Sequence, residues 1–301
     1  MMHITAEEAF QAYEAVRHRL PTAGSGNGPY RLIDSLADIA AEFDVFLLDA
    51  FGVLNIGDTA IPGTRERIDA LRSAGKRVLV VSNAASVPQA NLLKKYQRLG
   101  YRFDVGDIIT SRAAMASSML GMKDIRWGVM GGTDTQLDDL GSLRTQLLGD
   151  DPGDYADAEG FLLIGSGSWT GQRQKLLEEA LHSSPRPVLV ANPDIVAPRE
   201  DGFSAEPGHF AHRLADSTGI APRFFGKPFG NIYDLAFNRL GDVDRARVIM
   251  VGDSLHTDIL GAQAAGVASA LVARYGFFAG QDVDSAIERA GIVPDFVVDH
   301  P

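Results

Sequence analysis

The sequence predicts an α/β protein built on parallel strands, with helices packed on both faces of the sheet. Short apolar runs alternate along the chain with longer amphipathic stretches, as is typical of strand–helix–strand units. Some of the short runs, such as residues 78–81, are hydrophobic at every position, which indicates strands buried on both faces. The chemical motifs lie near the two ends of the chain, and the middle strands carry none. The sequence therefore predicts one α/β unit inserted into another.

The predicted elements follow one another in a regular order. Apolar runs bounded by turn residues predict strands at 44–48, 77–81, 126–130, 160–164, 187–191 and 247–251, with weaker candidates at 269–272 and 295–298. Helical periodicity fills the intervals at 63–74, 88–99, 111–120, 172–181, 208–217, 230–240 and 257–265. Several of these helices end at a glycine suited to a C-cap, such as Gly75, Gly100, Gly241 and Gly266.

The first forty residues form a separate segment. Residues 1–20 have the pattern of a polar helix, a stretch rich in glycine and proline follows at 21–29, and a second short helix is predicted near 35–41. We therefore predict an N-terminal helical extension at 1–40, a discontinuous core at 41–110 and 226–301, and an inserted α/β unit at 111–225.

Composition excludes several classes of protein. At 301 residues and 45% hydrophobic content, the chain can bury a large core in about two domains. The formal charge is −11 without a cationic cluster, which argues against nucleic acid as the partner. The absence of cysteine excludes disulfides and thiolate metal sites. No signal peptide or membrane-spanning stretch is recognisable, so we expect a cytoplasmic protein that does not bind membranes.

Polar residues gather where predicted strands end or helices begin, in four segments: 49–54, 80–83, 226–228 and 251–258. Asp49 ends an apolar strand and is followed by a glycine turn, which places a carboxylate at the edge of the sheet. Ser82 follows a second apolar strand, and Asp253 follows a third. Taken singly, each residue also fits a structural role as a turn or capping residue. Their combination in this order is much more specific.

The four segments together resemble the haloacid dehalogenase superfamily of aspartate-nucleophile hydrolases. More narrowly, they resemble subclass IIA with its large α/β cap, the branch of 4-nitrophenyl phosphatase, phosphoglycolate phosphatase and sugar phosphatases. The stretches that carry the resemblance are 52–54, 61–63, 82–83, 191–194, 226–228 and 251–259. The resemblance implies a Rossmann-like parallel-sheet core with an inserted α/β cap domain.

The same resemblance implies a Mg²⁺-dependent phosphatase for a small phosphorylated metabolite, such as a sugar phosphate. Asp49 is then the nucleophile that forms an aspartyl-phosphate. Mg²⁺, which prefers oxygen ligands, is expected on Asp49, on the backbone carbonyl of Phe51 and on Asp253, with Asp258 supporting the site.

The resemblance also assigns the groups that bind the phosphoryl group. Ser82, with the backbone or side chain of Asn83, is expected to donate hydrogen bonds to the phosphoryl oxygens. Lys227 is expected to offset the charge of the carboxylates and of the phosphoryl group. A homodimer formed through the cap is compatible with the resemblance.

Phe51 departs from the pattern, because phosphatases of this superfamily carry at this position an aspartate that protonates the leaving group. Loss of a positioned acid–base group typically costs about 10²- to 10⁴-fold in rate. Three hypotheses remain open: a phosphatase that is weak or uses a substitute group, such as His256 or a cap residue; a phospho-ligand-binding protein without turnover; and a dehalogenase-like hydrolase acting at carbon.

Two lesser signals lie in the predicted cap. Residues 192–194 follow a predicted strand and are our candidate for a loop that faces the substrate. His209 and His212 lie three apart on a predicted helix and, without a cluster of acidic ligands nearby, are expected at the surface.

Overall fold

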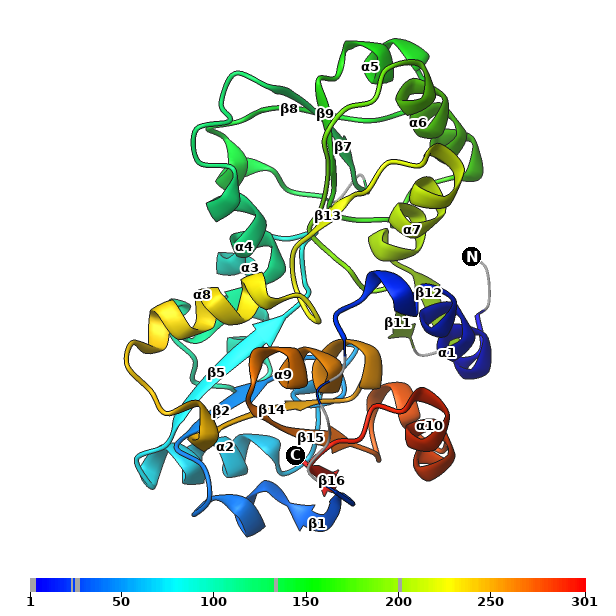
Figure 1. Ribbon diagram of the computed structural model, residues 1–301. Coiled ribbons are helices and arrows are strands. Elements are labelled where there is room, and N and C mark those ends of the chain that lie inside the picture. The colour runs from blue at the N-terminus through cyan, green and yellow to red at the C-terminus, as the bar shows by residue number, and fades with distance from the viewer. Residues whose placement is uncertain (1–3, 23, 25–27, 133–134, 200–201) are drawn as a thin grey trace.

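Two parallel sheets, each covered by helices, form the two lobes of the molecule (Figure 1). The computed structural model describes all residues except 1–3, 23, 25–27, 133–134 and 200–201, and part of the predicted 21–29 linker lies outside this described part. The α/β class, the parallel sheet and the inserted second lobe that the sequence predicts are confirmed.

The larger sheet has seven strands that are all parallel. Its spatial order is β1 (Arg31–Ser35), β16 (Phe296–His300), β15 (Ala268–Val272), β14 (Val248–Gly252), β2 (Val45–Leu48), β5 (Arg77–Ser82) and β6 (Ile108–Thr110). Helices α2 (Thr64–Ser73) and α3 (Gln89–Arg98) pack on one face, and α8 (Gly230–Leu240) and α9 (Leu260–Ala265) pack on the other. Alternate residues of β2 enter these two cores, which is why the whole strand is apolar.

The smaller sheet has five parallel strands, in the order β13 (Arg223–Phe224), β10 (Val188–Val190), β9 (Gly160–Leu163), β7 (Arg126–Met130) and β8 (Arg144–Leu147). Helices α5 (Pro152–Asp157), α6 (Gly171–Ser183) and α7 (Pro207–Thr218) cover one face. Helix α4 (Ser111–Ser118) packs on the other. All five strands lie within the segment 111–225, while the domain bounds themselves stay a prediction.

Two short antiparallel pairs complete the strands of the described part. β3 (Asn55–Ile56) and β4 (Thr59–Ala60) form a small hairpin directly after the turn that contains Asp49. β11 (Val196–Arg199) and β12 (Gly202–Ala205) form a second hairpin that extends from the smaller lobe toward the N-terminal helix (Figure 1).

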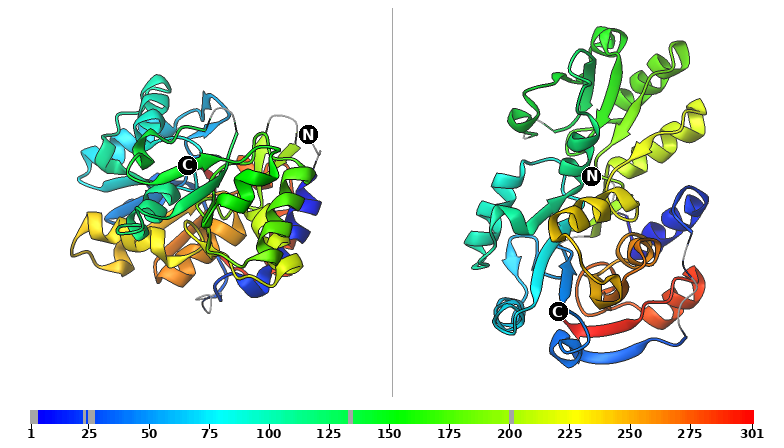
Figure 2. Two further views of the ribbon diagram at one scale, coloured as in Figure 1. Left: turned by 90° about the horizontal axis from the view of Figure 1, so that it is seen from above. Right: turned by 60° about the vertical axis from the view of Figure 1, so that its left-hand side comes forward.

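The N-terminal segment is tied to both lobes. Helix α1 (Ala6–Ala15) begins with a capping box in which Thr5 and Glu8 bond each other's backbone N–H groups. Its apolar face packs against the hairpin, the chain after β14 and helix α10 (Val283–Ala290). The right view of Figure 2 shows this dark blue helix beside the red C-terminal helix α10.

The prediction of a purely helical extension at 1–40 differs from the structure, because residues 31–35 form β1 at the edge of the larger sheet. This strand is mostly exposed and lacks an apolar run, so its sequence carries no strand pattern. The helix predicted at 257–265 also differs, because it begins earlier with one π-helical turn, Leu255–Ile259.

The surface expectation for His212 was wrong. Its side chain is 3% exposed and stacks on Phe224 of β13, with ring centroids 4.9 Å apart, because it lies on the inner face of α7.

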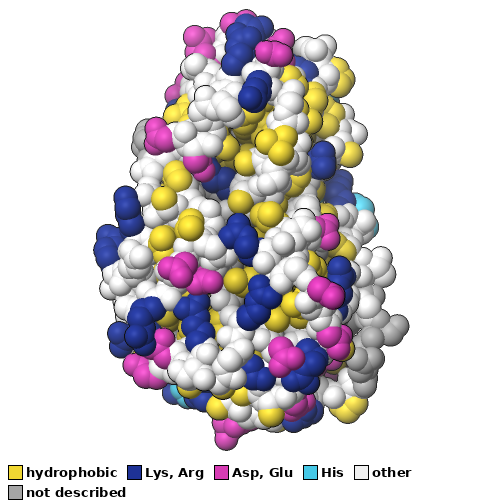
Figure 3. Space-filling model, turned by 90° about the vertical axis from the view of Figure 1, so that its left-hand side faces the viewer, with side chains coloured by type: hydrophobic (Ala, Val, Ile, Leu, Met, Phe, Trp, Pro, Cys, Tyr) yellow, Lys and Arg dark blue, Asp and Glu magenta, His cyan; other side chains and the backbone are white. Residues whose placement is uncertain are grey.

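At the surface, Figure 3 shows a face where basic and acidic side chains are interspersed. No helix in the described part of the chain is long and apolar enough to cross a membrane. The cytoplasmic location stays a prediction.

Candidate active site

The site lies where three neighbouring strands end at the same edge of the larger sheet. Asp49 directly follows β2, Ser82 ends β5 and Asp253 directly follows β14. The Asp49 backbone N–H donates to the carbonyl of Val251, 2.8 Å away, so the β2–β14 pairing continues up to the first of these residues. The parallel arrangement is what gathers residues that are far apart in the sequence.

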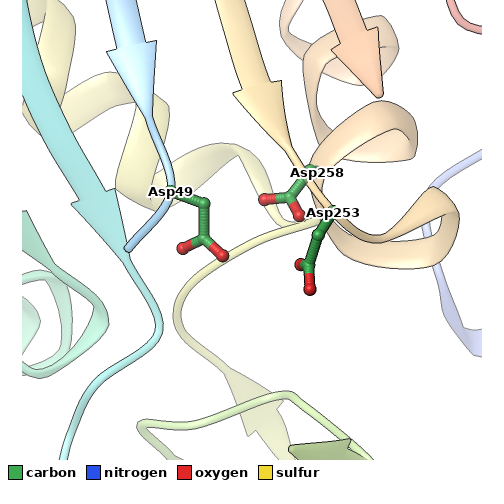
Figure 4. Close-up of side chains that lie close together, drawn as sticks. All are labelled: Asp49, Asp253 and Asp258. Atoms are coloured by element: carbon green, nitrogen blue, oxygen red, sulfur yellow. The ribbon is translucent and has the colours of Figure 1, made fainter. Parts of the chain in front are cut away.

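Three carboxylates converge at this edge, as Figure 4 shows for Asp49, Asp253 and Asp258. Each offers one oxygen atom, and these oxygens lie within 4.8 Å of one another. Asp253 and Asp258 are buried, and Asp49 is partly exposed. Placing three carboxylates so close together in a buried site is costly unless cations compensate their charge.

Lys227 supplies one compensating charge. Its Nζ lies 2.5 Å from Asp49 Oδ1 and 2.7 Å from Asp258 Oδ1, and its side chain is 2% exposed. Burial alone would lower the pKa of Lys227, but Asp258 and Asp49 outweigh it and raise the pKa above its usual value. The ammonium group is therefore charged at neutral pH, and it holds the nucleophile candidate in place.

Asp258 uses both of its oxygens within the protein. Oδ1 accepts from Lys227, and Oδ2 accepts from the backbone N–H of Ser254 at 3.1 Å. Burial raises the pKa of Asp258 to about 6, although Lys227 opposes that shift. This arrangement suits a residue that supports the cluster.

Asp253 is closely surrounded by backbone. Its Oδ2 accepts from the N–H of Phe277 at 2.8 Å. A Cβ added at Gly276 would lie 1.8 Å from Oδ2, and one at Gly52 would lie 2.6 Å from Asp253 Cβ, so both positions need glycine. Burial, followed by the charges of Asp49 and Asp258, raises the pKa of Asp253 well above its usual value.

The donor set fits a divalent cation. Three carboxylates face one positive side chain, so the cluster lacks positive charge, and hard cations such as Mg²⁺ and Ca²⁺ bind carboxylate oxygens. Phe51 lies in the turn after Asp49 and forms a bridge with Asn55, so its carbonyl belongs to the same turn as the nucleophile candidate. Its side chain brings no carboxylate to the site.

Ser82 and Asn83 stand beside the cluster but are used differently. Ser82 is buried; its Oγ accepts from the N–H of Ala84 at 3.3 Å, and its side chain is also hydrogen-bonded to that of Tyr96. Asn83 Nδ2 donates to the Lys227 carbonyl at 2.9 Å and to Asp194 Oδ1 at 2.7 Å, and Asn83 Oδ1 accepts from the Lys227 N–H at 2.8 Å. Both amide hydrogens of Asn83 are engaged, so its side chain positions Lys227.

His256, a predicted substitute acid–base group, faces the N-terminal helix. Its ring stacks on Tyr13 with centroids 4.9 Å apart, and its Nε2 lies 2.5 Å from Glu14 Oε1. The ring is buried, and burial lowers the pKa of His256. These contacts tie α1 to the turn between Asp253 and Asp258.

Sequence reasoning missed Tyr13 entirely. Besides stacking on His256, its hydroxyl accepts from the backbone N–H of Ile195, 3.1 Å away, in the loop after β10. Only the tertiary fold brings this helix to the loop, so no local pattern reveals the contact. The predicted substrate-facing loop at 192–194 does reach the site, through the bond between Asp194 and Asn83.

Two family models match the chain, and both describe haloacid dehalogenase-like hydrolases. One matches residues 46–140 and the other residues 224–300, and these ranges contain the four carboxyl- and lysine-bearing positions of the cluster. The 4-nitrophenylphosphatase of Schizosaccharomyces pombe is 28% identical over 282 residues, covering 86% of this chain and 92% of that protein.

Solved structures show the same fold. A crystal structure described as a possible sugar phosphatase of this superfamily, from Cytophaga hutchinsonii, superimposes with a TM-score of 0.78 at 24% identity, covering 90% of this chain and 98% of that one. A glycerol phosphate phosphatase from Mycobacterium tuberculosis in complex with calcium gives a TM-score of 0.64 at 27% identity, covering 79% of this chain and 68% of that one.

Proposed function

Because the chain belongs to the haloacid dehalogenase-like hydrolases, and its relatives are phosphatases, we propose that it hydrolyses a phosphate monoester of a small metabolite through an aspartyl-phosphate on Asp49. The observation that carries the proposal is the contact between Lys227 Nζ and Asp49 Oδ1 at 2.5 Å, inside a cluster of three carboxylates. The hydrogen bond from the ammonium group fixes the direction of this carboxylate, as an attacking nucleophile requires.

In this proposal Asp49 attacks phosphorus and the ester oxygen leaves on the opposite side. Lys227 offsets the negative charge of the phosphoryl oxygens, and the hydroxyl of Ser82 donates a hydrogen bond to one of them. Asn83 keeps Lys227 in place through two backbone hydrogen bonds, so its role is to position the ammonium group. Asp258 fixes the same ammonium group from the other side.

Asp49, Asp253 and the carbonyl of Phe51 would hold a Mg²⁺ ion, with Asp258 in support. When bound, the cation would supply Lewis-acid stabilisation of the phosphoryl charge. The raised pKa of Asp253 supports this assignment, because a cation would compensate the negative charges that cause part of the rise.

The substrate class follows from the relatives and from the site. The relatives named above act on nitrophenyl phosphate and glycerol phosphate, which supports a small phosphorylated metabolite such as a sugar phosphate as the substrate.

A second candidate function is binding of a phosphorylated ligand without turnover. Phe51 favours it, because a phenylalanine side chain cannot protonate a leaving alcohol. A homodimer stays a prediction.

The experiment is phosphate release from 4-nitrophenyl phosphate, with Mg²⁺ and with EDTA. We expect Mg²⁺-dependent release by the native protein and none by Asp49→Asn. Asp58→Asn serves as the control, because its carboxylate is 92% exposed and lies 3.4 Å from Lys95 Nζ at the surface. Equal rates for the native protein and Asp49→Asn would exclude the proposed nucleophile. Mg²⁺-dependent phosphate binding without turnover would favour the second candidate.

A further inference from the structure

The position of Phe51 leaves one group unaccounted for, namely the acid that protonates the leaving oxygen of an alkyl phosphate. His256 does not fill the gap, because its ring stacks on Tyr13 and its Nε2 bonds Glu14 on the side of α1. Asp258 does not fill it either, because Lys227 and Ser254 occupy both of its oxygens. If the protein hydrolyses alkyl phosphates, another group at this edge of the sheet has to supply the proton.

Asp194 is a carboxyl group of the smaller lobe that reaches this edge. It lies four residues after the end of β10, and its Oδ1 accepts from Asn83 Nδ2 at 2.7 Å. Asn83 directly follows Ser82 and bonds the backbone of Lys227, whose Nζ touches Asp49. The Asn83 side chain therefore links Asp194 directly to the turn that carries Lys227.

The position of Asp194 is fixed from three directions. Within its own loop, its N–H donates to Asn192 Oδ1 at 3.0 Å, and its carbonyl accepts from Gly208 at the start of α7. From the larger lobe, Asn83 holds its Oδ1. From α1, the Tyr13 hydroxyl accepts from the N–H of the next residue, Ile195. Proton transfer needs this kind of positioning, since a small displacement of the acid lengthens the hydrogen bond to the leaving oxygen.

The surroundings of Asp194 favour its protonated form. Burial raises the pKa of Asp194 to about 8; Asn83 and Lys227 oppose the rise, while Asp49 and Glu206 reinforce it. Tyr13, the titratable group that α1 brings to this place, is itself buried and neutral, because burial and Asp194 raise its pKa. A neutral carboxyl at pH 7 can donate a proton, and the bond from Asn83 to Oδ1 leaves Oδ2 to carry it.

We propose that Asp194 takes the acid–base role that Phe51 cannot perform, an inference that rests on the proposed function. As Asp49 Oδ bonds to phosphorus, the bond from phosphorus to the ester oxygen breaks, and the leaving oxygen takes the proton of Asp194. The resulting carboxylate then accepts a proton from water as the water oxygen attacks phosphorus. The Asp49–phosphorus bond breaks, phosphate leaves, and Asp49 and Asp194 return to their starting states.

A purely structural role for Asp194 makes a different prediction. If Asp194 served only as an acceptor for Asn83, an asparagine at this position would preserve activity. The asparagine side chain has the same shape, and its carbonyl oxygen accepts the same hydrogen bond. Asp194→Asn therefore keeps the structural contact and removes the transferable proton. This variant separates the two roles.

The experiment compares kcat/KM for an alkyl phosphate, glycerol phosphate, and for 4-nitrophenyl phosphate, whose leaving group needs no proton. For Asp194→Asn we expect a loss of roughly 10²-fold or more with glycerol phosphate and a much smaller loss with 4-nitrophenyl phosphate. The native protein should lose activity toward glycerol phosphate above about pH 8, and the variant should lack this dependence. The double variant with Phe51→Asp should regain activity. Asp216→Asn, an exposed cap carboxylate that pairs with Arg19, is the control and should behave as native.

The outcomes separate this inference from the proposed function. If Asp49→Asn abolishes Mg²⁺-dependent activity while Asp194→Asn leaves kcat/KM and its pH profile unchanged, the role of Asp194 is excluded and the nucleophile stands. An equal loss with both substrates, without rescue by Phe51→Asp, would also overturn the role of Asp194. If the native protein hydrolyses neither substrate, the proposed function itself fails.

Discussion

The ring of Tyr13 lies flat against His256, with the ring centroids 4.9 Å apart and the planes at 11°. This contact joins the N-terminal helix to the turn between Asp253 and Asp258. The Tyr13 hydroxyl also accepts from the N–H of Ile195, the residue after Asp194. Tyr13 therefore contacts the turn of the larger lobe and the Asp194 loop of the smaller lobe. The helix therefore connects the two lobes beside the proposed active site.

Removing the Tyr13 ring should be far more damaging than removing its hydroxyl. The side chain is 3% exposed, so Tyr13→Ala should lower the free energy of unfolding by about 3 kcal/mol or more. Tyr13→Phe, which removes the acceptor for Ile195, should cost about 1 kcal/mol. Urea unfolding measures both. Tyr30→Phe, whose hydroxyl bonds the exposed Asp284, is the matched control and should cost much less. Equal effects of Tyr13→Phe and Tyr30→Phe would contradict the role of the contact with Ile195.

Removing the charge of Lys227 should destabilise the fold in the absence of metal. Lys227→Met leaves Asp49 and Asp258 without their common buried partner, and breaking such a pair typically costs about 3 to 5 kcal/mol. Chemical unfolding in EDTA measures the loss, and Lys94→Met at an exposed position of α3 is the control. A variant as stable as the control would mean that the carboxylates do not depend on Lys227 for their charge balance.

Gly276 should be needed for cation binding, because a Cβ there would displace Asp253. The added atom would lie 1.8 Å from Asp253 Oδ2, at a φ of +74°. We expect Gly276→Ala to weaken Mg²⁺ binding at least tenfold, measured by calorimetric titration of a variant whose circular dichroism shows that it is folded. Gly280→Ala shares the strain at φ +72° but meets no atom within 4 Å, so its affinity should remain native. Identical affinities for the two variants would remove Asp253 from the metal site.

The buried ring of His212 should make the protein sensitive to acid. Burial lowers the pKa of His212 from 6.5 to about 4, so between these values the unfolded chain binds a proton that the folded protein does not. The stability that this group contributes is present above about pH 6.5 and is lost as the pH falls toward 4, a change of about 3 kcal/mol.

Replacing His212 tests this directly. Neither ring nitrogen has a hydrogen-bond partner among the described residues, so His212→Leu removes no bond of that kind. The variant should show a flatter dependence of unfolding free energy on pH between 7 and 4.5, as measured by urea unfolding. His182→Leu, at an exposed position of α6, is the control. An unchanged slope in His212→Leu would mean that other groups cause the acid sensitivity.

Much of the larger sheet could be predicted because its strands are apolar at almost every position. The strand at 44–48 and the one at 247–251 were located to within one residue, since burial on both faces leaves a continuous hydrophobic run. β1 was missed because it is an exposed edge strand, and β13 because two residues form no pattern. Their strand conformation comes from pairing with β16 and β10, which no local window contains.

The sequence predicts which residues form the candidate site better than it predicts their hydrogen bonds and contacts. Asp49, Lys227, Asp253 and Asp258 stand at strand and helix ends, and the structure brings them together. Whether the Asn83 side chain faces a ligand or the backbone of Lys227 depends on a contact between residues 144 positions apart. The orientation of the His256 ring was also unpredictable, because it depends on the packing of α1 against it.

The pairing of β1 with β16 has a consequence for how the protein is made. Among the described residues, β1 joins the sheet through a strand that comes more than 260 positions later, at residues 296–300. During synthesis, residues 31–35 therefore stay unpaired until residues 296–300 have left the ribosome. Since unpaired strands and open sheet edges can pair with other chains, a nascent copy is exposed to aggregation at this edge during that interval.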